Sequence, residues 1–191
     1  ILGISKFKTR WQLLKEKAGI EYSDFTGNAY TEYGNVMEDK IRQCVSIIEN
    51  TEFIEDKVIE GDMRYHADGV SHYKQTVLEI KTTSTIHEDV DEYDYYLCQL
   101  LTGMEMYGYE NGILAVYERP EDFSEVFDKG RMTMYKVKLS DYTMWLEYIH
   151  SEIDRFRDDW ARLKENPFTT EEELQPKEVV DIAKRVINLE A

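Results

Sequence analysis

Three strand-like segments follow one another with no helix between them, at residues 53–59, 63–70 and 76–82. Strands this close in sequence pair as antiparallel hairpins, because a parallel crossover needs a dozen or more residues. A helical pattern over residues 95–107 and a short apolar strand at 113–117 come next. A strand–helix–strand succession places its two strands parallel in one sheet. The order therefore predicts an α/β fold, with a mixed sheet flanked by helices.

Helical patterns lie on both sides of this β-rich region. Before it, we expect helices over residues 10–18 and 31–50. After it, an alternating segment predicts a strand over 131–139, and apolar periodicity predicts helices over 141–166 and 176–189. At 191 residues, the chain is long enough to bury a full hydrophobic core without disulfides or metals to hold it together.

The charge of the chain is strongly acidic. There are 39 acidic and 23 basic residues, a formal net charge of −16 at pH 7, which by itself argues against a nucleic-acid partner. Residues 1–19 are the exception, with five basic residues and one acidic residue. A basic segment on an acidic body can still meet a phosphate backbone, and a bound divalent metal would add positive charge. An acidic surface that serves solubility or protein interaction is the plainer alternative.

Cysteine use and hydropathy indicate a cytoplasmic protein. Cys44 and Cys98 lie far apart within helical patterns, as expected of reduced thiols. No apolar run approaches the roughly 20 residues of a membrane span, and no signal peptide is visible, so we expect no membrane partner. Because the chain opens on Ile1 instead of methionine, we expect that a segment precedes it.

The strand at 76–82 carries two charges among apolar residues. Glu79 and Lys81 are two apart, so they project from the same face. A hairpin centred between residues 73 and 74 places Asp68 opposite Glu79, and two carboxylates this close repel each other. A divalent cation such as Mg²⁺ between them would remove the repulsion. The alternative is an exposed Glu79–Lys81 ion pair, with Asp68 as a turn residue.

Two further polar residues lie on helix faces near apolar stripes. Glu38 is at the edge of the stripe of the helix at 31–50, one turn after Gly34. Gln99 follows Tyr96 by almost one turn in the helix at 95–107. Each also fits a plain role, as a solvated edge glutamate or as a member of a helix hydrogen-bond network.

Together these residues stand in the order of a known set of motifs. The chain resembles the PD-(D/E)XK nuclease superfamily and, more narrowly, the YqaJ-type viral recombinases of the lambda exonuclease group. The matching segments are residues 1–19, Gly34-x-x-x-Glu38, His66-Ala67-Asp68-Gly69, Glu79-Ile80-Lys81-Thr82 and Tyr96-x-x-Gln99. The resemblance covers residues 1 to about 109. It implies a restriction-endonuclease-like single domain, with a core of about 1–139 and a helical extension of about 140–191.

The resemblance also implies a metal site. Asp68 and Glu79 would bind Mg²⁺, for which Mn²⁺ can substitute, together with the backbone carbonyl of Ile80. Glu38 would add a ligand or hold a metal-bound water. Lys81 would orient and deprotonate the attacking water, or stabilise the charged transition state.

The remaining residues of the motifs are expected to contact substrate. Gln99 and Tyr96 would position the lysine or the scissile phosphate, and Thr82 would touch the substrate. The implied function is a Mg²⁺-dependent exonuclease of phage or prophage recombination that hydrolyses duplex DNA from its ends. A single-strand annealing protein and further copies of the chain are the expected partners. An inactive nuclease-fold DNA-binding or assembly module, or an endonuclease on the same fold, remain alternatives.

The basic residues of the N-terminal segment suggest a site for a DNA end. The resemblance places a terminal-phosphate pocket near this stretch, and Ser5 offers a hydroxyl and Arg10 a charge. Thr9 can cap the helix at 10–18 with Gln12 in the capping-box position, and a helix start favours anions. Surface ion pairs with the acidic body are the alternative, each worth about 0–1 kcal/mol.

Overall fold

The structure is a computed structural model that describes residues 2, 8–22 and 26–175. It forms two compact units, one from residues 1–24 and 150–191 and the other from residues 25–149. A single nuclease domain with a helical extension stays a prediction beside this division. The helix expected over 176–189 lies outside the described residues.

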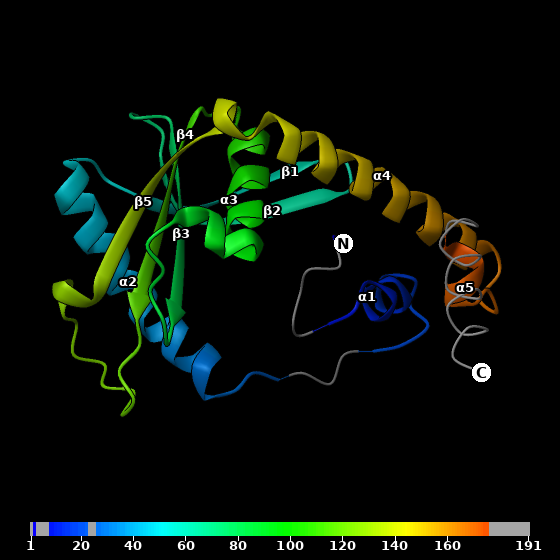
Figure 1. Cartoon of the computed structure of the whole chain (residues 1–191), viewed down its shortest axis with the longest axis horizontal. Helices are drawn as coiled ribbons and strands as arrows, with labels where there is room; N and C mark the ends of the chain where they lie inside the picture. Colours follow the sequence, from blue (N-terminus) through cyan, green and yellow to red (C-terminus); the bar gives the residue numbers. More distant parts are fainter. Residues whose placement is uncertain (1, 3–7, 23–25, 176–191) are drawn as a thin grey trace, which may run out of the picture. The chain divides into compact units, whose positions relative to one another are not determined.

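The larger unit contains a five-stranded sheet in the order β1-β2-β3-β4-β5 (Figure 1). The strands are β1 Ile54–Glu60, β2 Met63–Ser71, β3 Thr76–Thr83, β4 Asn111–Glu118 and β5 Met132–Lys138. β3 and β4 pair in parallel, and every other neighbouring pair is antiparallel. The predicted mixed sheet, with its antiparallel hairpins and one parallel crossover, is confirmed.

Two helices cover opposite faces of the sheet (Figure 1). On one face, α2 (Ala29–Glu49) packs Met37 and Ile41 into a buried cluster with Leu78 of β3. On the other face, α3 (Asp94–Tyr107) lies so close to β4 that a Cβ at Gly112 would meet the Met104 sulfur at 2.4 Å. The helices predicted over 31–50 and 95–107 are confirmed. α2 begins two residues early because the Asn28 side chain caps it by accepting a hydrogen bond from the Thr31 N–H.

An extra residue interrupts β2 at its centre. The pairs Gly69–Leu78, Val70–Val77 and Ser71–Thr76 confirm the predicted hairpin centre between residues 73 and 74. On the other side, Ile54 pairs with Val70 but Asp56 pairs with Ala67, so Glu55 of β1 faces both Asp68 and Gly69. This is a β-bulge, a device that re-aims a side chain. The β2–β3 pairing ends at Gly69, so the expected direct opposition of Asp68 and Glu79 is absent from the ladder.

Short 3₁₀ turns join several of these elements. η1 (Val90–Tyr93) occupies the acidic segment before α3, and η2 (Lys129–Arg131) precedes β5. η3 (Leu139–Tyr142) stands where the sequence predicted the start of a long helix, so α4 begins later and runs Thr143–Glu165.

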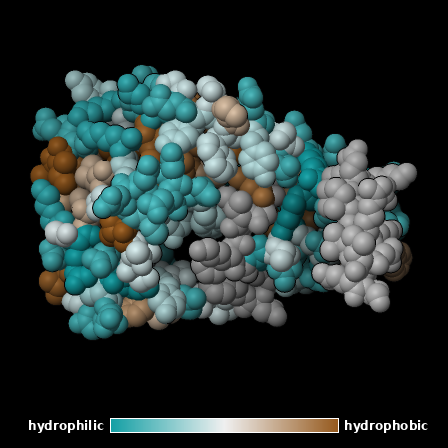
Figure 2. Space-filling model, viewed as in Figure 1, coloured by the Kyte–Doolittle hydropathy of each residue, from teal (hydrophilic) through white to brown (hydrophobic). Residues whose placement is uncertain are grey.

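The smaller unit is helical. α1 (Arg10–Lys17) begins with the predicted capping box between Thr9 and Gln12. Its Leu14 is buried in a cluster with α4 residues and with Leu174 of α5 (Glu171–Leu174), a helix that the sequence analysis missed. Within the described residues, no helix is long and apolar enough to cross a bilayer. On the face drawn in Figure 2, most described side chains are hydrophilic.

Candidate active site

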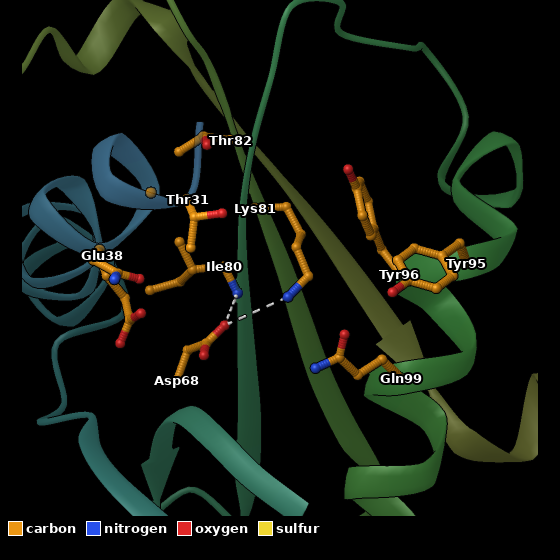
Figure 3. A pocket seen from close by; sticks show the side chains of 11 residues that line it. Thr31, Glu38, Asp68, Ile80, Lys81, Thr82, Tyr95, Tyr96 and Gln99 are labelled. Carbon is orange, nitrogen blue, oxygen red and sulfur yellow. Dashed lines mark hydrogen bonds and ion pairs between the residues drawn. The ribbon is translucent and has the colours of Figure 1, made fainter. Parts of the chain in front are cut away.

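A pocket of about 440 Å³ opens beside β3, between α2 and α3 (Figure 3). Its lining comes from four elements: Thr31, Gly34, Asn35 and Glu38 of α2, Asp68 of β2, Ile80, Lys81 and Thr82 of β3, and Tyr95, Tyr96 and Gln99 of α3. Seven residues singled out from the sequence therefore meet in one place: Glu38, Asp68, Ile80, Lys81, Thr82, Tyr96 and Gln99. Glu79, the eighth, lies directly beneath, bonded to Lys81.

The bulge directs Asp68 toward β3. Its Oδ2 accepts a hydrogen bond of 2.7 Å from the Ile80 N–H and lies 4.0 Å from the Lys81 Nζ (Figure 3). Because the β2–β3 ladder has ended, that N–H lacks a strand partner, and the side-chain carboxylate takes the place of a backbone carbonyl. The bond fixes Asp68 at the pocket wall, where its side chain remains about one fifth exposed.

Glu79 is fully buried, at 0% exposure. Its carboxylate pairs with the Lys81 ammonium, and its Oε2 accepts a hydrogen bond of 2.6 Å from the Tyr65 hydroxyl. Burial raises the pKa of Glu79 to about 7, and the charge of Lys81 and the Tyr65 hydrogen bond act against a larger rise. Both oxygens thus have donors on the protein side, so Glu79 forms the floor of the site.

Lys81 is held as a cation at the centre of the pocket. Burial alone would lower its pKa, but the carboxylates of Glu79 and Asp68 outweigh that effect and keep the pKa above its ordinary value. The ammonium also lies 5.8 Å from the centre of the Tyr96 ring, a cation–π contact. Lys81 therefore offers a positive charge and hydrogen-bond donors at the place where the two carboxylates meet.

Arg42 is a site residue that sequence reasoning missed. Its buried guanidinium donates a 2.9 Å hydrogen bond to the Asp68 carbonyl and pairs with Glu38 at 3.5 Å and with Glu55 at 2.7 Å. It pairs with Asp39 as well. One side chain thus links α2, β1 and the β2 bulge behind two of the predicted ligands. Its position one turn after Glu38 was the available signal, but the contacts to β1 and β2 arise only in the fold.

Glu38 and Asp68 influence each other across the pocket. Burial raises the pKa of Glu38, the Asp68 carboxylate raises it further, and Arg42 opposes both effects. The two carboxylates also border a neighbouring hollow of about 500 Å³, together with His66 and Glu55. Glu38 and Asp68 therefore line both hollows.

The oxygen donors of the pocket fit a hard divalent cation. The carboxylates of Asp68 and Glu38 open on it, and the Ile80 backbone forms part of the same wall. Mg²⁺ binds one or two carboxylates and keeps several waters, which suits this small set. Within residues 8–22 and 26–175, no group of three His, Cys, Asp or Glu side chains already converges on one point. Glu79 could join as a ligand only after release from Lys81.

The residues predicted for a DNA end come from the N-terminal segment of the chain. Arg10 belongs to the smaller unit, where its guanidinium pairs with Asp159 at 2.7 Å and stacks 5.4 Å from the Phe156 ring centre. Lys8 pairs with Glu16 at 2.5 Å. Ser5 lies outside the described residues. The terminal-phosphate site stays a prediction.

Solved structures with the same arrangement of strands and helices are known. A phage-related exonuclease from Haemophilus somnus 129PT superposes with a TM-score of 0.61 and 14% identity, over 79% of this chain and 80% of that one. An alkaline exonuclease from Laribacter hongkongensis, LHK-Exo, gives 0.61 and 16%, over 86% of each chain. The chain shares its fold with these exonucleases. No protein-family model and no curated protein matches the sequence.

Proposed function

We propose that this chain is a metal-dependent DNA nuclease of the PD-(D/E)XK superfamily, an exonuclease of the YqaJ and lambda exonuclease type. The observation that carries the proposal is the convergence of Glu38, Asp68 and Lys81 from three separate elements on one pocket, with Glu79 beneath. These are the residues that the motifs singled out. The fold shared with two exonucleases supports the same conclusion, as does the structure of LHK-Exo in complex with dAMP, a nucleotide ligand of that enzyme.

Asp68, Glu38 and the Ile80 carbonyl would hold Mg²⁺ or Mn²⁺, with Glu79 as a further ligand once Lys81 turns to substrate. A metal ion bound here supplies two things that phosphodiester hydrolysis needs, an acidified water and relief of negative charge on the phosphate. Arg42 keeps Glu38 and the Asp68 backbone in place for this role.

The other side chains act on the phosphate and the water. Lys81, held as a cation, orients the attacking water and stabilises the charge that develops on the phosphate oxygens. Gln99 and Tyr96 lie across the pocket from Asp68, where the amide can donate to a phosphate oxygen (Figure 3). Thr82 would contact the neighbouring nucleotide. The proposed substrate is the end of a DNA duplex, and the proposed partner is a protein that anneals the exposed single strand.

The test is digestion of linear and closed circular duplex DNA with and without Mg²⁺. We expect cleavage of linear DNA only, and only with metal. Asp68→Asn should abolish cleavage, whereas Asp141→Asn, an exposed aspartate in η3, should leave it unchanged. Equal digestion of circular DNA would indicate an endonuclease. Metal and DNA binding without any cleavage would indicate an inactive binding module.

A further inference from the structure

Arg119 is fixed immediately beyond the end of β4. Its backbone N–H donates a 2.7 Å hydrogen bond to the carbonyl of Thr83, the last residue of β3. β3 and β4 run in parallel, so both strands end at the same edge of the sheet. Lys81 pairs with Val116, so the backbone of Arg119 is held three residues further along β4 than the partner of Lys81.

The side chain of Arg119 contacts two neighbouring aromatic rings. Its guanidinium carbon lies 4.5 Å from the centre of the Tyr30 ring and 5.2 Å from that of Phe123. The two rings are themselves 5.4 Å apart. Phe123 has a φ of +53°, a left-handed conformation that a bulky residue adopts only where its surroundings impose it. Both contacts are cation–π interactions, which hold a cation near aromatic rings without the use of a hydrogen-bond acceptor.

No acidic group neutralises this cation. In the part of the chain that the structure describes, no ion pair and no hydrogen bond engages the Arg119 guanidinium. Nearby Arg131, by contrast, pairs with Glu118 at 3.7 Å. In a chain of net charge −16, a half-buried arginine that is positioned by two rings yet has no carboxylate partner is prepared for an anion from outside.

Arg119 borders the proposed active site. Its ring contact Tyr30 precedes Thr31, and its backbone partner Thr83 follows Thr82. Thr31 and Thr82 both line the pocket. Burial raises the pKa of Tyr96, while the charges of Lys81 and Arg119 act against that rise, so both cations act at the same ring. A nucleic-acid strand whose scissile phosphate lies at Lys81 would pass this edge of the sheet.

We propose that Arg119 forms a phosphate subsite at the rim of the pocket, where its guanidinium binds a backbone phosphate next to the scissile one. The inference rests on the proposed nuclease function and adds a residue outside the motifs. Arginine suits the task because its planar fork donates two parallel hydrogen bonds to one phosphate, whereas lysine acts as a point charge. The subsite would read no base, so it contributes affinity for any sequence.

A purely structural role is the alternative, in which Arg119 only fastens residues 120–128 to α2. Binding as a function of salt separates the two, because each phosphate contact adds about one to the slope of log affinity against log salt concentration. The probe is a short fluorescein-labelled duplex, measured by anisotropy with Ca²⁺ in place of Mg²⁺. Arg131→Gln is the matched control, since it removes the same charge from a paired arginine.

We expect Arg119→Gln to weaken duplex binding about tenfold, lower the salt slope by about one, and raise KM about tenfold with little change in kcat. Arg131→Gln should match the wild type in slope. Equal slopes for Arg119→Gln and the wild type, or equal losses in both variants, would overturn the subsite. If Arg119→Gln does not fold, Arg119→Lys decides, because wild-type affinity there would also overturn it. A wild type that neither binds nor cleaves DNA would instead refute the nuclease proposal itself.

Discussion

Replacing Tyr65 with phenylalanine isolates the hydrogen bond that supports Glu79 from below. The ring can stay where it is, because a Cβ at Gly103 of α3 would come within 2.2 Å of it, so the two already pack without free space. The change removes only the hydroxyl that donates to Glu79 Oε2 at 2.6 Å. Tyr65 is 5% exposed and Glu79 0%, so solvent does not reach the oxygen that loses its donor.

The expected destabilisation is about 2 kcal/mol at neutral to alkaline pH, because hydrogen bonds to charged groups contribute roughly 1.5–3 kcal/mol. The pKa of Glu79 in the folded protein, about 7, already lies above its ordinary value of 4.5. Because folded Glu79 holds its proton to a higher pH than unfolded Glu79 does, the stability of the protein falls as pH rises from about 4.5 to about 7. The Tyr65 hydroxyl reduces this fall in stability, because it donates its hydrogen bond to the charged form of Glu79. The loss in Tyr65→Phe should therefore be larger above pH 7 than near pH 5, where Glu79 is mostly protonated.

Urea unfolding of the metal-free protein at about pH 5 and about pH 8.5 measures both quantities, as a shift of the midpoint at constant slope. Tyr73→Phe is the control, since Tyr73 is 90% exposed and loses no buried contact when its hydroxyl is removed. If Tyr65→Phe unfolds at the wild-type urea concentration at both pH values, the hydrogen bond does not stabilise Glu79 and the reasoning is refuted.

Three other predictions follow from the same contacts. Gly103→Ala should destabilise the protein by about 1–3 kcal/mol, seen as a lower melting temperature, because its Cβ would overlap the Tyr65 ring; an unchanged melting temperature would contradict this. Arg42→Met should lower the free energy of unfolding, measured with urea, by about 1–2 kcal/mol, because the Asp68 carbonyl loses its hydrogen-bond donor and the partly exposed carboxylates around Arg42 lose their cation. Arg42→Lys should recover part of this loss. Equal stability of the Met and Lys variants would argue against the ion-pair cluster. Burial raises the pKa of the Cys98 thiol to about 11, so iodoacetamide should modify Cys98 slowly at pH 8 and faster toward pH 11. The stability that this thiol contributes should fall as pH rises from about 9 to 11. Rapid labelling of the folded protein at pH 8 would count against the burial of Cys98.

Local patterns were sufficient for most of the fold. The apolar strand pattern over 76–82 and the helical period over 95–107 depend on nearest neighbours along the chain. Both elements were found within one residue of their predicted ends. The same holds for Glu79 and Lys81, whose common face follows from the two-residue period of a strand. The parallel pairing of β3 and β4 followed from the intervening helix.

Contacts between segments that are distant in the chain could not be predicted from the sequence. The bulge at Asp68 depends on how β1 pairs with β2, and no local signal fixes that register at one residue. In the sequence, Tyr65 is one tyrosine of a strand and Arg42 one arginine of a helix. Only the folded structure shows that Tyr65 contacts Glu79 and that Arg42 contacts Glu38. The 3₁₀ turn before α4 was missed because serine and aspartate, the residue types of Ser140 and Asp141, are favoured both at turns and at helix starts.

Because β2 contains one extra residue, the arrangement of the site depends on the number of residues in this strand as well as on their identity. A β2 shortened by one residue at Asp68 or Gly69 could pair with β1 without interruption, in a more regular sheet. In that chain the half-strand from Met63 to Ala67 would be turned over relative to β3, so Tyr65 would face away from Glu79. Redesign that straightens this strand would thus improve the ladder and dismantle the pocket. Sequence searches for similar sites should therefore allow the spacing between the aspartate and the Glu-x-Lys triplet to vary by one residue.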